Sequence, residues 1–252
     1  MNFRLAVTMP VFNEEQGIVD FLLEIVGSLA NYELSLFVVD DYSTDQTVNR
    51  LVEFQKQFPD VNLTLIENKK NLGHGPSTIK GMSLAVAIDP EAILTVDGDG
   101  QFIGKDIAMT VKAFTEGQVD VLEGVRIKRS DPFFRRISTG AVRLLVWSRC
   151  HKLPLDGNTP FRIYRSSKLQ ELLVTLPSNL FLPNVYASAY TRGHRWNVLE
   201  VEVTSIPPRG KDPLGSTWKQ KYKKLPSKRF LKFCLGAFLQ WQKTIIPKYE
   251  SK

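Results

Sequence analysis

The chain has 252 residues with a formal charge of +7, and 43% of its residues are hydrophobic. This length and composition suit a folded protein with a substantial core and exclude a disordered or fibrous chain. Cys150 and Cys234 are too far apart for a zinc-site spacing, and no apolar run reaches the roughly 20 residues of a membrane span.

The first part of the chain alternates between short apolar runs and amphipathic segments. We expect strands at 3–9, 34–39, 61–67 and 92–96. Helices are expected at 13–30, 45–58 and 77–87, the first capped by Asn13 and the second by Ser43 or Thr44. Regular alternation of this kind predicts an α/β fold, a mainly parallel sheet with helices on both faces.

Beyond residue 104 the alternation is looser. Helices are expected at 107–114, 133–150, 167–176 and 183–192, and strands at 119–125 and 196–205. A loop from residue 156 leads into a further short strand that ends at 165. The sequence contains no internal repeat.

An acidic turn, Asp97-Gly98-Asp99-Gly100, follows the fourth expected strand. Ligands of open α/β sheets bind at the carboxyl ends of the strands. Asp97, Asp99 and the amide oxygen of Gln101 offer three hard oxygen donors, a set that suits Mg²⁺ or Mn²⁺. Taken alone, the motif is equally consistent with a solvated acidic turn.

The C-terminal segment carries the whole positive excess. Residues 209–252 hold 12 Lys and Arg against two acids, and an apolar block at 230–241 follows the basic cluster. This pattern predicts a C-terminal amphipathic helical tail that lies on an anionic membrane surface. The alternative is that the helix packs on the rest of the chain or on a second subunit, in a homo-oligomer. No nucleic-acid-binding motif accompanies the basic residues.

Seven short motifs follow one another along the chain. They are VTMPVFNEE (7–15), VVDDYSTDQT (38–47), NLGHGP (71–76), DGDGQF (97–102), GVR (124–126), RRIS (135–138) and DGNTPFRIY (156–164). In this order they resemble glycosyltransferase family 2 of the GT-A superfamily. The subgroup with the most similar motifs is the dolichyl-phosphate mannose synthase-like enzymes, which include bacterial polyprenyl-phosphate glycosyltransferases. The resemblance covers roughly residues 3–216.

The resemblance implies a GT-A, Rossmann-like catalytic domain at 1–208, followed by the tail at 209–252. It places Pro10, Asn13 and Glu14 in the nucleotide pocket, with Asp41 on the base or ribose and Asp40 supporting the turn. Asp97, Asp99 and Gln101 would hold the metal on the donor diphosphate. Arg126, Arg136 and Ser138 would meet phosphate groups, and Arg209 would reach the pyrophosphate from the far side. The catalytic roles fall to Asp99, Arg126 and Arg136.

The acceptor is predicted from the absence of a base. A hydroxyl acceptor must lose its proton to a base, whereas a phosphate monoester is largely dianionic at pH 7. The late Glu-Asp pair of hydroxyl-acceptor relatives is missing after Asp131. We therefore expect sugar transfer from a UDP- or GDP-sugar to a polyprenyl phosphate, with Asp156 a turn-stabilising residue or, alternatively, a base. Arg162 is equally an ion-pair partner or a phosphate contact, and His74 is assigned to a loop.

Two other functions remain open. One is a glycosyltransferase that acts on a saccharide or protein hydroxyl, and the other is a non-catalytic nucleotide-sugar binding protein. The sequence opens on a strand-like run rather than a signal peptide, so we expect a cytoplasmic protein, peripheral at the cytoplasmic membrane face. Pro160 departs from the family, in which glycine precedes the Phe-Arg pair, and proline fixes φ and removes a hydrogen-bond donor.

Overall fold

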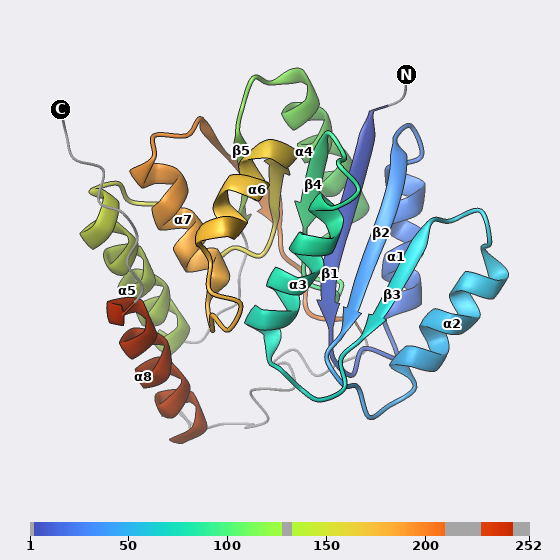
Figure 1. Cartoon of the computed structure of the whole chain (residues 1–252), viewed down its shortest axis with the longest axis horizontal. Helices are drawn as coiled ribbons and strands as arrows, with labels where there is room; N and C mark the ends of the chain where they lie inside the picture. The colour runs from blue at the N-terminus through green and yellow to red at the C-terminus, as the bar shows by residue number, and fades with distance from the viewer. Residues whose placement is uncertain (1–2, 128–132, 210–227, 244–252) are drawn as a thin grey trace.

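A seven-stranded sheet runs through the computed structural model, which describes residues 3–127, 133–209 and 228–243 (Figure 1). The strands are β1 (Arg4–Val11), β2 (Glu33–Asp40), β3 (Leu63–Glu67), β4 (Ala92–Thr95), β5 (Val121–Ile127), β6 (Arg162–Arg165) and β7 (Val198–Thr204). Their order is β3-β2-β1-β4-β6-β5-β7. Strand β6 is antiparallel to both neighbours and every other pairing is parallel, which confirms the predicted mainly parallel sheet.

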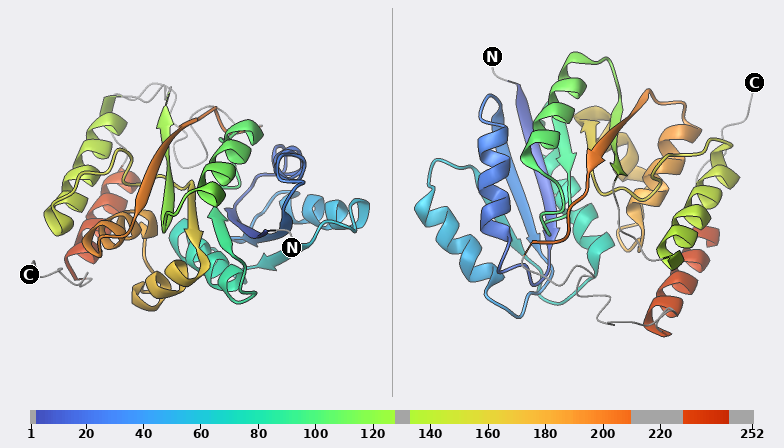
Figure 2. Two further views of the ribbon diagram at one scale, coloured as in Figure 1. Left: turned by 90° about the horizontal axis from the view of Figure 1, so that it is seen from above. Right: turned by 180° about the vertical axis from the view of Figure 1, so that it is seen from behind.

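Helices cover both faces of the sheet, as predicted. They are α1 (Ile18–Ser28), α2 (Thr47–Gln57), α3 (His74–Val86), α4 (Gly104–Glu116), α5 (Phe133–Cys150), α6 (Ser166–Thr175), α7 (Pro183–Gly193) and α8 (Lys228–Lys243). Apolar residues of α1, α2 and α4 form one core against the sheet, and those of α3, α6 and α7 form a second core on its other face. Figure 2 shows α1 and α4 in front of the sheet when the molecule is seen from behind.

The structure corrects both predicted helix caps. Asn13 does not cap α1, which begins five residues later, at Ile18, after Gly17. The backbone of Asn13 has a left-handed φ of 55°, and its side-chain oxygen accepts a hydrogen bond from Thr44 N (2.8 Å). Neither Ser43 nor Thr44 caps α2, because Asp45 Oδ1 accepts from Thr47 N (3.0 Å) instead. Polar side chains after β1 and β2 therefore tie two loops together rather than capping helices.

Helix α8 packs beside α5 at one end of the molecule (Figure 1). Arg149 donates to the Trp241 carbonyl (3.2 Å), and the Trp241 ring lies 4.9 Å from the Tyr186 ring. Trp241 is therefore buried against the fold, whereas the membrane prediction places the whole apolar block at 230–241 on a membrane surface. The basic residues of the predicted tail from Lys211 to Lys224 lie outside the described residues. None of the described helices is both long enough and apolar enough to cross a bilayer.

Candidate active site

Three parallel strands end at the same edge of the sheet and bring separate motifs together. In the register of the sheet, Val11 of β1 lies opposite Asp40 of β2, and Thr8 of β1 lies opposite Thr95 of β4. The residues that follow each strand therefore meet at one edge, where open α/β sheets bind ligands. These residues include most of the nucleotide-pocket and metal ligands predicted from the sequence.

The acidic turn is held close to the end of β1. Gly98 N donates to the Pro10 carbonyl (3.2 Å), and a side chain on Gly98 would collide with Val11. Gly100 has a φ of 68°, a left-handed conformation that glycine adopts without strain. The two glycines thus permit a turn that presents Asp97 and Asp99 beside the end of β1.

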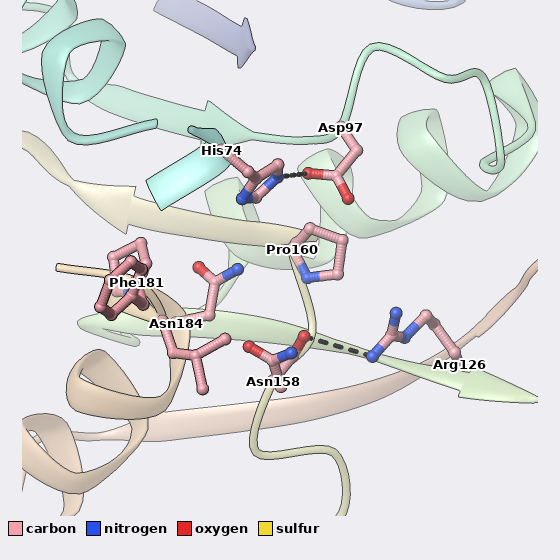
Figure 3. A pocket seen from close by; sticks show the side chains of 9 residues that line it. His74, Asp97, Arg126, Asn158, Pro160, Phe181 and Asn184 are labelled. Carbon is pink, nitrogen blue, oxygen red and sulfur yellow. Dashed lines mark hydrogen bonds and ion pairs between the residues drawn. The ribbon is translucent and has the colours of Figure 1, made fainter. Parts of the chain in front are cut away.

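His74 contacts the acidic turn, a position that the loop assignment from the sequence misses. Its Nε2 lies 2.7 Å from Asp97 Oδ1 (Figure 3). Burial favours the neutral imidazole, but the carboxylates of Asp97, Asp99 and Asp41 together outweigh burial and raise the pKa of His74. The sequence signal that could have identified His74 is its place in the NLGHGP motif, at the start of α3.

The carboxylates of the site repel one another. Burial, and then the charges of Asp97 and Glu14, raise the pKa of Asp99 to about 7. For Asp97, burial opposes ionisation, but His74 and then Arg126 hold the pKa of its carboxyl below the usual value. A divalent cation between these side chains would offset the repulsion.

The donor set fits Mg²⁺ or Mn²⁺. In the described parts of the chain, no group of three or more His, Cys, Asp or Glu side chains could hold a metal by itself. Mg²⁺ in particular is usually bound by one or two carboxylates, with water and substrate phosphates completing its ligands. Asp97 and Asp99 meet that requirement. The third predicted ligand, Gln101, donates its backbone N–H to Asp99 Oδ1 (3.2 Å), which orients this carboxylate.

The predicted nucleotide-pocket residues Asn13, Glu14 and Asp40 support the loops after β1 and β2. Glu14 N donates to Thr47 Oγ1 (2.7 Å), and Asp40 Oδ2 accepts from Ser43 N (2.9 Å). This hydrogen bond places Asp40 at the base of the turn after β2. Contact of Pro10, Asn13 and Glu14 with a nucleotide stays a prediction.

The Asp41 carboxylate accepts four hydrogen bonds from within the chain, which gives it a structural role. Its carboxylate accepts hydrogen bonds from Leu72 N (2.8 Å) and Gly73 N (2.8 Å), and also from Asn68 Nδ2 and Ser77 Oγ. The side chain is buried. Because Asn68, Leu72 and Gly73 lie between β3 and His74, and Ser77 lies in α3, Asp41 ties the end of β2 to the His74–Asp97 contact.

We expect Asp41→Ala to lower stability and weaken donor binding together. Four donors would lose a buried acceptor, which lowers the free energy of unfolding by about 1–3 kcal/mol. The donor KM should rise more than kcat falls, because the loop that flanks the predicted nucleotide pocket loosens. Urea unfolding and steady-state kinetics measure the two effects. The exposed Asp60→Ala is the matched control, and a pure kcat loss would place Asp41 in the chemistry instead.

A small pocket of about 100 Å³ opens beside Asp97 (Figure 3). It is lined by His74, Asp97, Arg126, Asn158, Pro160, Phe181, Leu182, Pro183 and Asn184. The lining therefore comes from the acidic turn, the start of α3, the end of β5, the loop before β6 and the start of α7.

Arg126 holds the loop before β6 in place. Its Nε donates to Asp156 Oδ2 (2.7 Å) and its Nη2 to Asp156 Oδ1 (3.0 Å) and the Asn158 carbonyl (3.2 Å). Asp156 is thus the turn-stabilising residue of the two alternatives, since a carboxylate in a bidentate ion pair is a poor base. Contact of Arg126 with phosphate stays a prediction. Pro160, which stands where the family has glycine, also lies in this loop. Its carbonyl accepts a hydrogen bond from Thr95 Oγ1 (3.0 Å).

A buried ionic network lies behind the pocket and settles the role of Arg162. Both Arg162 and Arg192 pair with Glu123 of β5, at 2.5 Å and 2.7 Å. Arg162 is fully buried, and it also donates to the Thr159 carbonyl (3.2 Å) and to Ser188 Oγ (2.6 Å). It is an ion-pair partner that holds the loop before β6 against α7.

The remaining residues predicted to contact phosphate are Arg209, Arg136 and Ser138. Arg209 donates from Nε to the Gly100 carbonyl (3.1 Å), and its guanidinium pairs with Glu24. It therefore braces the acidic turn, and its reach to a pyrophosphate stays a prediction. Arg136 and Ser138 belong to the first half of α5, and their side chains lie outside the described part of the structure.

The sequence profile described as Glycosyl transferase family 2 matches residues 6–173, which hold β2, β4, most of β1 and the acidic turn. The chain belongs to glycosyl transferase family 2. Family membership confirms the predicted enzyme class, a glycosyltransferase.

The chain is also similar to curated proteins with named activities. The chain is 28% identical over 187 residues to a dodecaprenyl-phosphate galacturonate synthase of Rhizobium johnstonii, which covers 72% of this chain. It is 25% identical over 190 residues to an undecaprenyl-phosphate 4-deoxy-4-formamido-L-arabinose transferase of Edwardsiella ictaluri, which covers 75% of this chain. The chain spans little more than half the length of these two enzymes, 54% and 57%. An uncharacterised protein of Methanocaldococcus jannaschii is 29% identical over 65% of this chain and 72% of its own length.

Solved structures confirm the GT-A fold. The glucosyl-3-phosphoglycerate synthase of Mycobacterium tuberculosis, in complex with Mn²⁺ and UDP-glucose, has a TM-score of 0.61 at 14% identity and covers 97% of this chain and 80% of its own. A mannosyltransferase of Pyrobaculum calidifontis, in complex with GDP-mannose and Mn²⁺, has a TM-score of 0.55 at 18% identity and covers 83% of this chain and 59% of its own. At these identities the likeness concerns the fold alone.

Proposed function

We propose that this chain is the catalytic part of a metal-dependent, inverting glycosyltransferase that moves a sugar from a nucleotide diphosphate to a polyprenyl phosphate. The observation that carries the proposal is the placement of Asp97 and Asp99 at the edge of the sheet, next to a pocket that Arg126 lines. A cation on these carboxylates would stabilise the charge of the diphosphate as the sugar leaves. Both solved structures described above contain Mn²⁺ and a nucleotide-sugar, which supports the same use here.

The acceptor proposal depends on the chemistry of the pocket lining. Among the residues that line it in the described structure, Asp97 is the one acid, and it belongs to the metal pair. Asp156, the other base considered, is paired with Arg126. A phosphate acceptor needs no base, and the named curated relatives act on dodecaprenyl and undecaprenyl phosphates.

Calorimetry and an acceptor assay test this function. We expect UDP or GDP to bind only when Mn²⁺ or Mg²⁺ is present, and sugar transfer to appear with a short polyprenyl phosphate. The same assay with free monosaccharides and serine peptides tests the hydroxyl-acceptor alternative. Absence of metal-dependent nucleotide binding would contradict the enzyme proposal, and transfer to a hydroxyl would replace the proposed acceptor.

We propose that α8 also brings the protein to an anionic membrane. Leu235, Phe238 and Leu239 stay exposed on α8, although Trp241 packs inward. We expect co-sedimentation with anionic but not zwitterionic vesicles, weakened by salt. Replacing the three exposed residues with Ser should reduce vesicle binding. Val174→Ser, which changes an exposed apolar residue of α6, serves as the control.

A full-length protein that stays in the supernatant with anionic vesicles at low salt would contradict the membrane proposal. The exposed face of α8 would then be assigned to a second subunit, and light scattering would measure that association. Placement at the cytoplasmic face stays a prediction.

A further inference from the structure

Asn184 is a buried polar residue in the pocket that has an unused acceptor. It lies in the first turn of α7, directly after Pro183, and only 4% of its surface is exposed. Its Oδ1 has no hydrogen-bond partner among the residues that the structure describes. In Figure 3 its amide group points from α7 into the pocket, toward His74 and Pro160. A buried acceptor without a partner is costly, so its persistence here points to a ligand that supplies one.

The chemistry of the atom restricts the ligand. An amide oxygen accepts hydrogen bonds and cannot donate them. A phosphate dianion has no proton to give and would be repelled by this oxygen. A sugar offers hydroxyl groups, or an amide N–H in an amino sugar, that can donate.

The position of Asn184 relative to Asp97 indicates which sugar it meets. Asp97 lines the same pocket and, by the proposed function, carries the cation on the donor diphosphate. The group attached to that diphosphate is the sugar to be transferred, and it must lie between the cation and the acceptor. On the proposed function, therefore, the space in front of Asn184 is the place of the transferred sugar.

We propose that Asn184 recognises, through its amide oxygen, one hydroxyl or N–H group of the transferred sugar and so selects the donor. The inference rests on the proposed function and adds to it a residue that determines sugar specificity. A site built to hydrogen-bond a substrate group discriminates strongly against an analogue that lacks it, because the buried acceptor is then left unpaired.

The test removes the Asn184 amide and the sugar group that would contact it, first one at a time and then together, and compares the effects on kcat/KM. The best donor is first found among UDP-glucose, UDP-galactose, UDP-galacturonate and GDP-mannose, with Mn²⁺ and a short polyprenyl phosphate. Its monodeoxy analogues are then compared in the wild type and in Asn184→Leu. We expect Asn184→Leu to lower kcat/KM for the full donor about 10- to 100-fold, and to leave kcat/KM unchanged for one particular deoxy analogue.

Two further variants make the test sharp. Asn184→Thr keeps a hydroxyl acceptor and should recover part of the selectivity, and it provides the comparison if the leucine variant does not fold. Asn179→Leu makes the same change on an exposed residue before α7 and should leave the donor preference intact. Binding of UDP or GDP alone with Mn²⁺ should stay unchanged in every variant, because the nucleotide lies outside this contact.

The outcomes separate this inference from the proposed function. An equal loss of kcat/KM for the donor and all its deoxy analogues would overturn the role of Asn184 and leave the proposed function standing. A wild-type chain that binds neither nucleotide with Mn²⁺ and uses none of the donors would overturn both.

Discussion

Asp99→Asn should lower turnover by about 10²- to 10⁴-fold while the fold stays intact. The neutral amide removes one of the two anionic ligands of the proposed cation, and metal stabilisation of the leaving charge is worth several kcal/mol, each 1.36 kcal/mol being tenfold in rate. The turn does not depend on the charge, because the Asp99 carbonyl accepts from Arg209 N (3.0 Å) and an amide oxygen can still accept from Gln101 N. Mn²⁺ titration of kcat, with circular dichroism of the variant, measures both parts.

The exposed Asp20→Asn on α1 is the matched control and should behave as the wild type. Removing the Asp99 charge also relieves repulsion with Asp97 and Glu14, so the variant should be no less stable than the parent. If turnover and its Mn²⁺ dependence are unchanged in Asp99→Asn, this residue does not hold the metal.

Local patterns were sufficient to predict most of the fold. The apolar, β-branched runs mark strands, and the predicted segment 133–150 coincides with α5. Sheet order is less accessible, because β6 lies antiparallel between β4 and β5, a pairing that depends on contacts between residues distant in sequence. Periodicity identifies an apolar helix face but not what covers it, which is why the inward packing of Trp241 could not be predicted.

The candidate site shows the same division. Asp97 and Asp99 were identified because their motif is continuous in sequence. His74 was missed as a site residue because its partner Asp97 is 23 residues away, and the two meet only when β4 and the loop before α3 reach one edge of the sheet. The unpartnered oxygen of Asn184 depends on its burial, which the sequence does not specify. Site residues that belong to one continuous motif are therefore predictable here, and residues whose role depends on contacts made only in the folded chain are not.

Glu123→Gln should produce the largest loss of stability among these predictions. The carboxylate, 1% exposed, is the shared partner of Arg162 and Arg192, and the charges of these two arginines hold the pKa of Glu123 below its usual value although burial alone would raise it. Glutamine keeps the size but removes the carboxylate that both buried guanidiniums share. Glu200 still pairs with Arg192, and the Asp156 charge still acts on Arg162. Breaking a buried ion pair from one side costs about 3–5 kcal/mol.

In a chain of this size, that loss corresponds to a fall in Tm of roughly 6–20 °C. Urea unfolding and calorimetry measure it, with Glu116→Gln as the control, because Glu116 forms an exposed pair with Lys112 on α4 and such pairs contribute little. Arg162 holds the loop that carries Asn158 and Pro160, so the variant should also lose selectivity among donors at temperatures where it is still folded. A loss of stability below about 1 kcal/mol would mean that Glu200 and Asp156 are enough to balance the two arginines, since a buried guanidinium without a counter-charge is costly.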